Sequence, residues 1–350
     1  MDINRRRALG LGTVAAAGAV LGSPMVAAAQ TQVRESAPAD DDTTTPADSA
    51  AARRRIERVY KLGRTWARGT WSAIITVTDP DGTPVPAVAE EADRVVDAQS
   101  VNKLAVATAV LDKVDRGLLK LDQRVEVTAD IVLRDGDGIF AVDGAYPSSV
   151  TLGHAIANLL VLSDNTAVRL CGSVCGTAEV NEILAAKGFT HTRVKPSTRP
   201  DRFFLGWTTP RETHDLLRRL TAGTLLSETS TTYMLNALRC TSAFNDGVRL
   251  RLSTPERLRV ATKAGWFATD RHEAGLVFDT AGKPIVCYSL FATGEFRGDA
   301  TANNADFTTN HPAIAARSVL GRTMMDSVIR LTNPSARTHR APAYRPGNGG

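Results

Sequence analysis

The runs of this 350-residue chain that favour β-strands lie near its two ends, and the long middle has a helical pattern. A helix over 51–68 precedes the β-rich run 71–78, which ends in the turn-forming sequence 79–82, and a second strand should reach about residue 96. Further strands and a last helix are expected late in the chain, at 258–262, 274–279, 284–292 and about 312–331. The pattern predicts an α+β fold.

In this fold an antiparallel sheet, built from both chain ends and flanked by helices, packs against an inserted all-helical domain over about 98–240. The helices expected in that insertion begin with an apolar stripe over 104–118 and continue at 152–162, 166–171, 177–187, 209–222 and 227–238. The whole folded domain should cover 53–331, which is enough chain to bury a large core.

The N-terminus predicts export. Three arginines at 5–7, a short apolar run over 8–20 and three alanines at 27–29 form a signal over 1–29, cleaved after Ala29. Arg5 and Arg6 favour the twin-arginine route. A membrane-spanning helix is less consistent with so short a run, rich in Gly and Ala. We expect a secreted, periplasmic or cell-wall-associated protein without a membrane span after cleavage.

Two polar segments flank the folded part. Residues 30–52, rich in Ala, Asp, Thr, Pro and Ser, should be a disordered linker, and 332–350 a disordered tail. The net charge is +5, but the arginines are scattered, so no nucleic-acid partner is indicated. Only 8 of the 42 basic residues are lysines, and two of these lysines occupy the motifs described next. A site that needs a titratable amine requires lysine, because arginine keeps its proton.

Three short motifs carry the chemistry. Ser-Val-Asn-Lys at 100–103 opens an apolar helix and places a hydroxyl and an amine one helical turn apart on one face. Ser-Asp-Asn at 163–165 lies 163 − 100 = 63 positions further on, and Lys-Ala-Gly at 263–265 lies 263 − 163 = 100 beyond that. In isolation the first serine could be an N-cap and the tripeptide a turn. The order and spacing of all three overturn those interpretations.

The three motifs together resemble those of the penicillin-recognising serine enzymes, and within them the class A β-lactamases, over roughly residues 51–331. The resemblance implies that Ser100 is the nucleophile, Lys103 the base that takes its proton, and Lys263 an electrostatic partner. Ser163 would relay a proton to the leaving nitrogen, and Asn165 would hold a substrate amide. Asp164 should orient its loop.

The third motif implies how the substrate is held. Gly265 would let the substrate backbone approach the sheet edge. An oxyanion hole is implied at the backbone N–H groups of Ser100 and Trp266. The motif also departs from the family, which carries Thr or Ser in place of Ala264, a hydroxyl that helps to hold the substrate carboxylate.

Two nearby side chains could compensate for that missing hydroxyl. His272 falls where many class A enzymes place a carboxylate-binding arginine, and Arg271 lies beside it. For Arg271, a surface position at a strand start is an equally good interpretation.

The second departure is in the loop 198–210, which resembles a shortened Ω-loop. No Glu occupies the position of the family's water-activating base, where Phe204 falls instead. Glu212, the nearest carboxylate downstream, should lie on the next helix. Acylation could then proceed through Lys103 while deacylation is slow.

No cofactor or metal site is indicated. Cys171 and Cys175 are four positions apart on an expected helix, a poor geometry for bridging each other, and the pattern leaves open whether Cys240 or Cys287 forms a disulfide. We expect a monomer whose partner is a small-molecule β-lactam or a peptidoglycan peptide.

The leading prediction is a β-lactamase-like serine hydrolase. A D-alanyl-D-alanine peptidase or esterase on the same scaffold is the alternative enzyme, favoured by the missing glutamate and by Ala264. A non-catalytic binder of peptidoglycan or β-lactam is the third possibility.

Overall fold

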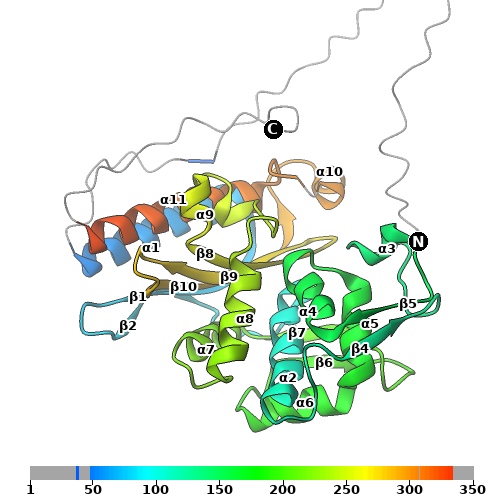
Figure 1. The fold of residues 1–350 in the computed structure, drawn as a ribbon. Helices are drawn as coiled ribbons and strands as arrows, with labels where there is room; N and C mark the ends of the chain where they lie inside the picture. Colours follow the sequence, from blue (N-terminus) through cyan, green and yellow to red (C-terminus); the bar gives the residue numbers. More distant parts are fainter. Residues whose placement is uncertain (1–36, 39–47, 307, 334–350) are drawn as a thin grey trace, which may run out of the picture. The chain divides into compact units, whose positions relative to one another are not determined.

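A five-stranded antiparallel sheet, with strand order β2-β1-β10-β9-β8, is the centre of the fold (Figure 1). Its strands come from both ends of the chain, as predicted: β1 (Arg68–Thr78), β2 (Pro84–Glu90), β8 (Val260–Phe267), β9 (Asp270–Phe278) and β10 (Pro284–Phe296). The computed structural model describes residues 37–38, 48–306 and 308–333. The predicted signal, and most of the predicted linker and tail, lie outside these residues.

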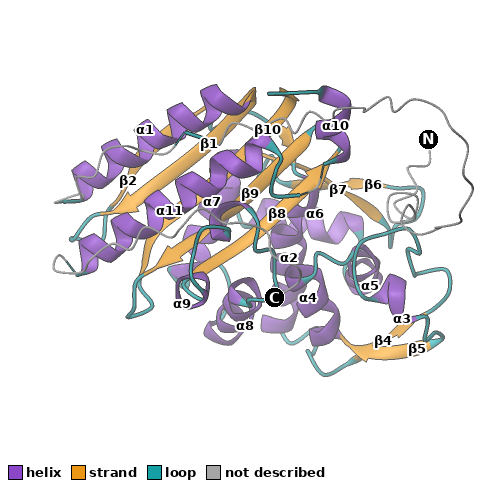
Figure 2. Cartoon of the chain, turned by 90° about the horizontal axis from the view of Figure 1, so that it is seen from above, coloured by secondary structure: helices purple, strands orange, loops and turns teal. Residues whose placement is uncertain are grey.

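Helices α1 (Ser49–Ala67) and α11 (Pro312–Thr332) lie side by side on one face of the sheet (Figure 2). Their apolar side chains form one core with the strands beneath them. Helix α1 begins inside the stretch that the sequence assigned to the linker. Asp48 is the reason, because its carboxylate accepts a hydrogen bond from the backbone N of Ala51 at 2.7 Å and caps the helix.

The other face of the sheet carries the inserted segment, which has its own core. Its helices are α2 (Lys103–Asp115), α3 (Phe140–Asp143), α4 (Leu152–Val161), α5 (Asn165–Val174), α6 (Thr177–Ala186) and α8 (Glu228–Arg239). The segment is not purely helical. It also contains the antiparallel pair of β4 (Arg124–Val127) with β5 (Ser148–Thr151) and the hairpin of β6 (Arg193–Pro196) with β7 (Phe203–Thr208), which a third, two-residue strand extends. Strands this short leave almost no alternation to find in a sequence.

Helix α7 (Pro210–Thr221) lies in the inserted part of the sequence but packs against β1, β9 and β10. His214 Nε2 lies 2.9 Å from the hydroxyl of Thr76 on β1, which fixes the helix to the sheet. The predicted helix is therefore confirmed, and its place is on the sheet rather than in the insertion. Amphipathic periodicity shows that a helix has a buried face but not which surface covers it.

The remaining elements are short: β3 (Val96–Asp97), η2 (Gln99–Asn102), η3 (Gly247–Arg249), α9 (Thr254–Arg257) and α10 (Ala300–Ala305). All four cysteines are free thiols, and Cys171 and Cys175 do not bridge, as predicted. Among the helices of the described residues, none combines the length and apolar character needed to cross a membrane.

Candidate active site

Ser100 lies in the 3₁₀ turn η2, which leads directly into α2. The sequence placed Ser100 in the helix itself, whereas the α-helix begins at Lys103. Gln99, just before the serine, has a φ of 47°, a left-handed conformation that costs a residue with a side chain roughly 1–2 kcal/mol. The turn packs on β8, so the strained Gln99 lies where the turn that holds Ser100 meets the sheet.

Gly265 on β8 makes this contact possible. A Cβ atom at this position would lie 2.8 Å from the backbone N of Ser100 and 2.8 Å from that of Val101. Those atoms are backbone and cannot rotate away. Besides the predicted approach of the substrate backbone, the missing side chain of Gly265 accommodates the turn that holds Ser100.

Two lysine side chains converge on the hydroxyl of Ser163. Lys103 Nζ donates to Ser163 Oγ at 3.1 Å, to Asn165 Oδ1 at 2.8 Å and to the carbonyl of Ser163. Lys263 Nζ donates to the same Oγ at 3.0 Å and to the carbonyl of Ala264 at 2.8 Å. The structure thus brings together four of the predicted site residues, which lie far apart in the sequence.

Burial changes the acidity of both amines. It lowers the pKa of Lys103 to about 7, against the opposing pull of the carboxylates of Asp137 and Asp164. Burial, followed by the positive charge of Lys103, lowers the pKa of Lys263 well below its usual value. Two ammonium groups that share one hydroxyl repel each other. A neutral amine that can accept a proton is therefore available near neutral pH.

The hydroxyl of Ser100 makes no hydrogen bond within the described part of the chain. The amine of Lys103 is turned toward Ser163 and Asn165 instead, so the structure does not bring the predicted nucleophile and base into hydrogen-bond contact. Such contacts are often long without substrate and tighten when it binds. Ser100 is partly exposed and so can be reached by a ligand.

Asp164 orients its loop, as the sequence predicted. It is fully buried, and one carboxylate oxygen caps α5 by accepting from Ala167 N at 2.9 Å. The other oxygen accepts from Phe140 N at 3.0 Å. Ser163 beside it has a φ of 56°, so this anchoring holds the serine in a strained conformation between the two lysines.

The hairpin β6–β7 contains most of the segment that the sequence likens to a shortened Ω-loop, and it is tied to the turn that holds Ser100. Asn102, one residue before Lys103, donates through Nδ2 to the carbonyls of Leu205 and Trp207. Ala98 N donates to the carbonyl of Gly206 at 2.9 Å. The predicted shortened loop is therefore a fixed hairpin.

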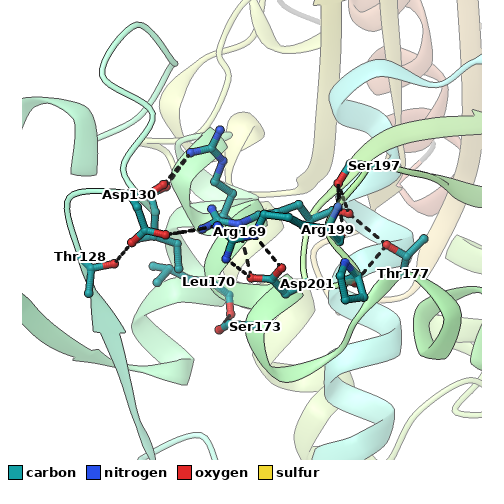
Figure 3. Close-up of polar contacts among 12 residues, drawn as sticks. Thr128, Asp130, Arg169, Leu170, Ser173, Thr177, Ser197, Arg199 and Asp201 are labelled. Atoms are coloured by element: carbon teal, nitrogen blue, oxygen red, sulfur yellow. Dashed lines mark hydrogen bonds and ion pairs between the residues drawn. The ribbon is translucent and has the colours of Figure 1, made fainter.

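The far end of this hairpin is held as well (Figure 3). Arg199 and Arg202 reach the carboxylate of Asp130, at 3.4 Å and 3.1 Å. The hydroxyl of Thr177 donates to the carbonyls of Pro200 at 3.2 Å and of Arg202 at 3.1 Å. These exposed ion pairs are individually weak, but together with the hydrogen bonds they fix the turn on the helical segment.

Phe204 lies on β7 with 63 % of its surface exposed, and it supplies no carboxylate. Glu212 lies in the first turn of α7, as predicted. Its carboxylate accepts from the backbone N atoms of Thr190, His191 and Thr192, at 2.9, 3.0 and 2.6 Å. Glu212 therefore holds that loop.

Arg271 does not reach the site. It is fully buried, and it donates to the backbone carbonyls of residues 268, 270, 303 and 306 at 2.7–2.9 Å. It also pairs with Trp266 across the strands, on the face opposite Lys263. The interpretation of Arg271 as a substrate ligand or as a surface residue is corrected by this burial. The Trp266 ring packs edge-on against Phe244, with ring centres 4.9 Å apart.

His272 pairs with Gly265 and so lies on the same face of the sheet as Lys263. It is buried, its Nδ1 accepts from Ala292 N at 3.2 Å, and its ring packs on Phe291. Burial, with help from the charge of Arg317, lowers the pKa of His272 to about 3. A neutral imidazole offers a carboxylate no charge, so His272 could compensate for the missing hydroxyl only as a hydrogen-bond donor through Nε2.

Two residues of the site had no role in the sequence interpretation. Asn102 lies inside the first motif and links it to the hairpin. Asp137, in a Gly-flanked loop, has a carboxylate close enough to raise the pKa of both lysines, and its carbonyl accepts from Asn165 N at 2.8 Å. The pattern Asp-Gly-Asp-Gly at 135–138 signalled a turn but not its location.

This arrangement can deprotonate a serine, stabilise charge beside it and return a proton through Ser163. Over the described ranges, no three His, Cys, Asp or Glu side chains are grouped so that they could hold a metal ion.

Comparison with known proteins agrees with this geometry. The sequence model of the Beta-lactamase enzyme family matches residues 67–328. Beta-lactamase VEB-1 of Pseudomonas aeruginosa is 26 % identical over 175 residues, which are 48 % of this chain and 58 % of that protein. The match thus spans little more than half of the relative's length.

Solved structures share the fold. A beta-lactamase from Sphaerobacter thermophilus has a TM-score of 0.62 and 21 % identity, covering 81 % of this chain and 98 % of that one. A mutant of PBP-A, solved as an acyl-enzyme complex with penicillin G, has a TM-score of 0.61 and 18 % identity, covering 78 % and 95 %.

Proposed function

This chain belongs to the beta-lactamase enzyme family, and we propose on that premise that it is a serine hydrolase that forms an acyl-enzyme at Ser100. The observation that carries the proposal is the convergence of Lys103 and Lys263 on Ser163, beside the turn that holds Ser100. Burying an amine lowers the stability of a protein. Two lysines buried around one hydroxyl are therefore better explained by a catalytic role than by a structural one.

In the proposed reaction, neutral Lys103 takes the proton of Ser100 as its Oγ attacks the carbonyl carbon of the substrate. The backbone N–H groups of Ser100 and Trp266 stabilise the oxyanion. Ser163 then gives its proton to the leaving nitrogen and regains one from the lysines bonded to it. The carbonyl–nitrogen bond breaks, and the acyl group remains on Ser100.

Deacylation is the step that separates the candidate functions. A β-lactamase must release the acyl group quickly, whereas Phe204 occupies the hairpin position expected for a water-activating glutamate, and Glu212 is engaged elsewhere. This feature favours the second candidate, a D-alanyl-D-alanine peptidase or esterase that β-lactams acylate for a long time.

A time-resolved mass spectrum after mixing the protein with a penicillin, a cephalosporin and a D-Ala-D-Ala peptide tests the proposal. We expect a β-lactam adduct on Ser100 that accumulates in a burst and decays slowly. Rapid steady turnover without an adduct would show that the protein is a β-lactamase. The water that removes the acyl group would then be activated by a residue outside the hairpin. A complex without any covalent adduct would indicate a non-catalytic binder and overturn the enzyme.

The base assignment predicts a pH profile. With a pKa of about 7, Lys103 gains its neutral form as pH rises, so the acylation rate should increase from pH 6 to 8 and then level off. Lys103→Arg should lower the acylation rate about a hundredfold or more, as much as Lys103→Ala should, because guanidinium stays charged. Acylation rates measured between pH 6 and 8 test whether Lys103 is the base. A rate that does not change with pH would mean that another group takes the proton of Ser100.

The proposal includes export of the folded chain, supported by Arg5 and Arg6 ahead of the apolar run. Replacement of both arginines by lysine should leave precursor inside the cell in a fractionation experiment. Unchanged secretion would favour the general secretory route.

A further inference from the structure

The hairpin β6–β7 has one face that combines two cations with two aromatic rings. Arg193 pairs with Trp207 and Lys195 pairs with Phe204 across the strands, so these four side chains share a face, called here the hairpin face. The guanidinium carbon of Arg193 lies 5.2 Å from the centre of the Trp207 ring, and Lys195 Nζ lies 5.9 Å from it. Both cations are exposed, as is the ring of Phe204.

A β-bulge brings the two aromatic rings to the same face. Phe204 and Trp207 are three positions apart, so in a regular strand their side chains would point to opposite faces. The register shifts between Arg193 and Lys195, which leaves one extra residue on β7. Gly206 in this bulge has a φ of 68°, and a Cβ there would lie 2.2 Å from the carbonyl oxygen of Arg193. The arrangement of the hairpin face therefore depends on a glycine at this position.

The backbone behind the hairpin face is held on both strands. Asn181 on α6 donates to the carbonyl of Val194 at 3.0 Å and accepts from Val194 N at 2.8 Å. Because β6 is the outer strand of its sheet, these are the backbone groups that a peptide strand added at this edge would use. On β7, Asn102 bonds to the carbonyls of Leu205 and Trp207. A partner must therefore bind through the side chains, which need little further ordering.

The charge of the hairpin face is not balanced by the chain itself. Neither Arg193 nor Lys195 forms an ion pair with another residue that the structure describes, whereas the arginines at the tip of the hairpin pair with acids. Asp97 on β3 pairs with Trp207, so one carboxylate lies on this face as well. Two cations against one carboxylate leave the face positively charged, which favours an anionic partner.

The shape of the hairpin face distinguishes between anionic partners. A membrane surface is bound best by protruding apolar side chains, but the tip of this hairpin, over 197–202, is polar and is held against the helical segment. The exposed ring of Phe204 lies on the side of the hairpin instead, where it offers a flat apolar surface to the C–H face of a sugar ring. Carboxylates of the sugar would pair with the two cations that Trp207 holds in place.

We propose that the hairpin face docks linear acidic polysaccharides, such as polymers of uronic acids. This inference goes beyond the proposed acyl-enzyme and does not depend on it. Since Asn102 bonds the same hairpin to the turn that holds Ser100, docking would bring the candidate active site to the polymer.

Surface plasmon resonance on immobilised polygalacturonate tests the proposal, with neutral dextran as the reference polymer. The parent protein should bind polygalacturonate but not dextran, and the affinity should fall as salt rises. The double variant Arg193→Gln/Lys195→Gln should lose about tenfold in affinity and much of the salt dependence. Phe204→Ala should lose affinity severalfold and keep the salt dependence, because the ring carries no charge.

The matched control is the double variant Lys120→Gln/Lys283→Gln, which removes the same charge from two exposed positions outside the hairpin. It should bind polygalacturonate as the parent does, and a thermal melt checks that each variant is folded. An equal loss in this control, or a parent that binds dextran as well as polygalacturonate, would overturn the inference. So would tighter binding to single-stranded DNA or to phosphatidylglycerol vesicles. No readout requires acylation of Ser100, so a failure here is distinct from a failure of the proposed function.

Discussion

Replacing Ser100 with alanine is expected to abolish covalent labelling by a fluorescent penicillin and to leave the protein folded. The bond to the ligand is formed by Oγ, so no other change in the site can compensate. The stability cost should stay below about 1 kcal/mol, because this hydroxyl has no hydrogen-bond partner within the described residues. Labelling on a gel and a thermal melt measure the two effects.

Ser227→Ala is a matched control with the opposite outcome. The Ser227 hydroxyl caps α8 by accepting from Ser230 N at 3.2 Å, and it donates to Asp115 at 2.6 Å. Its loss should cost about 1 kcal/mol or more and keep full labelling. If Ser100→Ala still reacted, another residue would be the nucleophile.

Gly265→Ala should damage both activity and stability, although it adds a single methyl group. That group would lie 2.8 Å from two backbone nitrogens, so the turn that holds Ser100 must shift. Overpacking of this kind costs about 1–3 kcal/mol, and a displacement of about 1 Å lowers the reaction rate on the order of a hundredfold. Acylation rates and denaturant titration test both parts.

Gly223→Ala is a control for the reverse case, a glycine at which an added methyl group meets no neighbour and only the backbone conformation is strained. Gly223 has a φ of 70° and no atom within 4 Å of an added Cβ. Its alanine variant should lose about 1 kcal/mol and retain the parent acylation rate. Equal acylation by the Gly265 variant and the parent would mean that the turn does not depend on close contact with β8.

Much of the fold could be predicted because its elements are long and patterned. The strands at both ends and the helices between them follow hydrophobic periodicity, and the structure confirms them. The hairpin β6–β7 could not be found this way, since Asn102 and Thr177, distant in sequence, hold it in place. The position of α7 on the sheet could not be predicted either, because tertiary packing decides which surface covers the buried face of a helix.

The site shows a similar division. Motif spacing correctly predicted that Lys103, Ser163, Asn165 and Lys263 lie together, as the hydrogen bonds among their side chains show. The error on Arg271 came from proximity in sequence, since adjacent residues of a strand point to opposite faces. The contact of Gly265 with the Ser100 turn could not be predicted, because a glycine in a sequence does not indicate which neighbour occupies the space beside it.

The pairing of β1 with β10 also constrains how this protein is made. Ile74 lies opposite Ser289, 289 − 74 = 215 positions later. A growing chain on the ribosome must therefore carry β1 with one edge unpaired until nearly the whole sequence has emerged, and such edges invite aggregation. The inserted helical segment can form earlier, from contacts nearer in sequence. Closure of the sheet is thus a late event, which must precede any export that requires a folded chain.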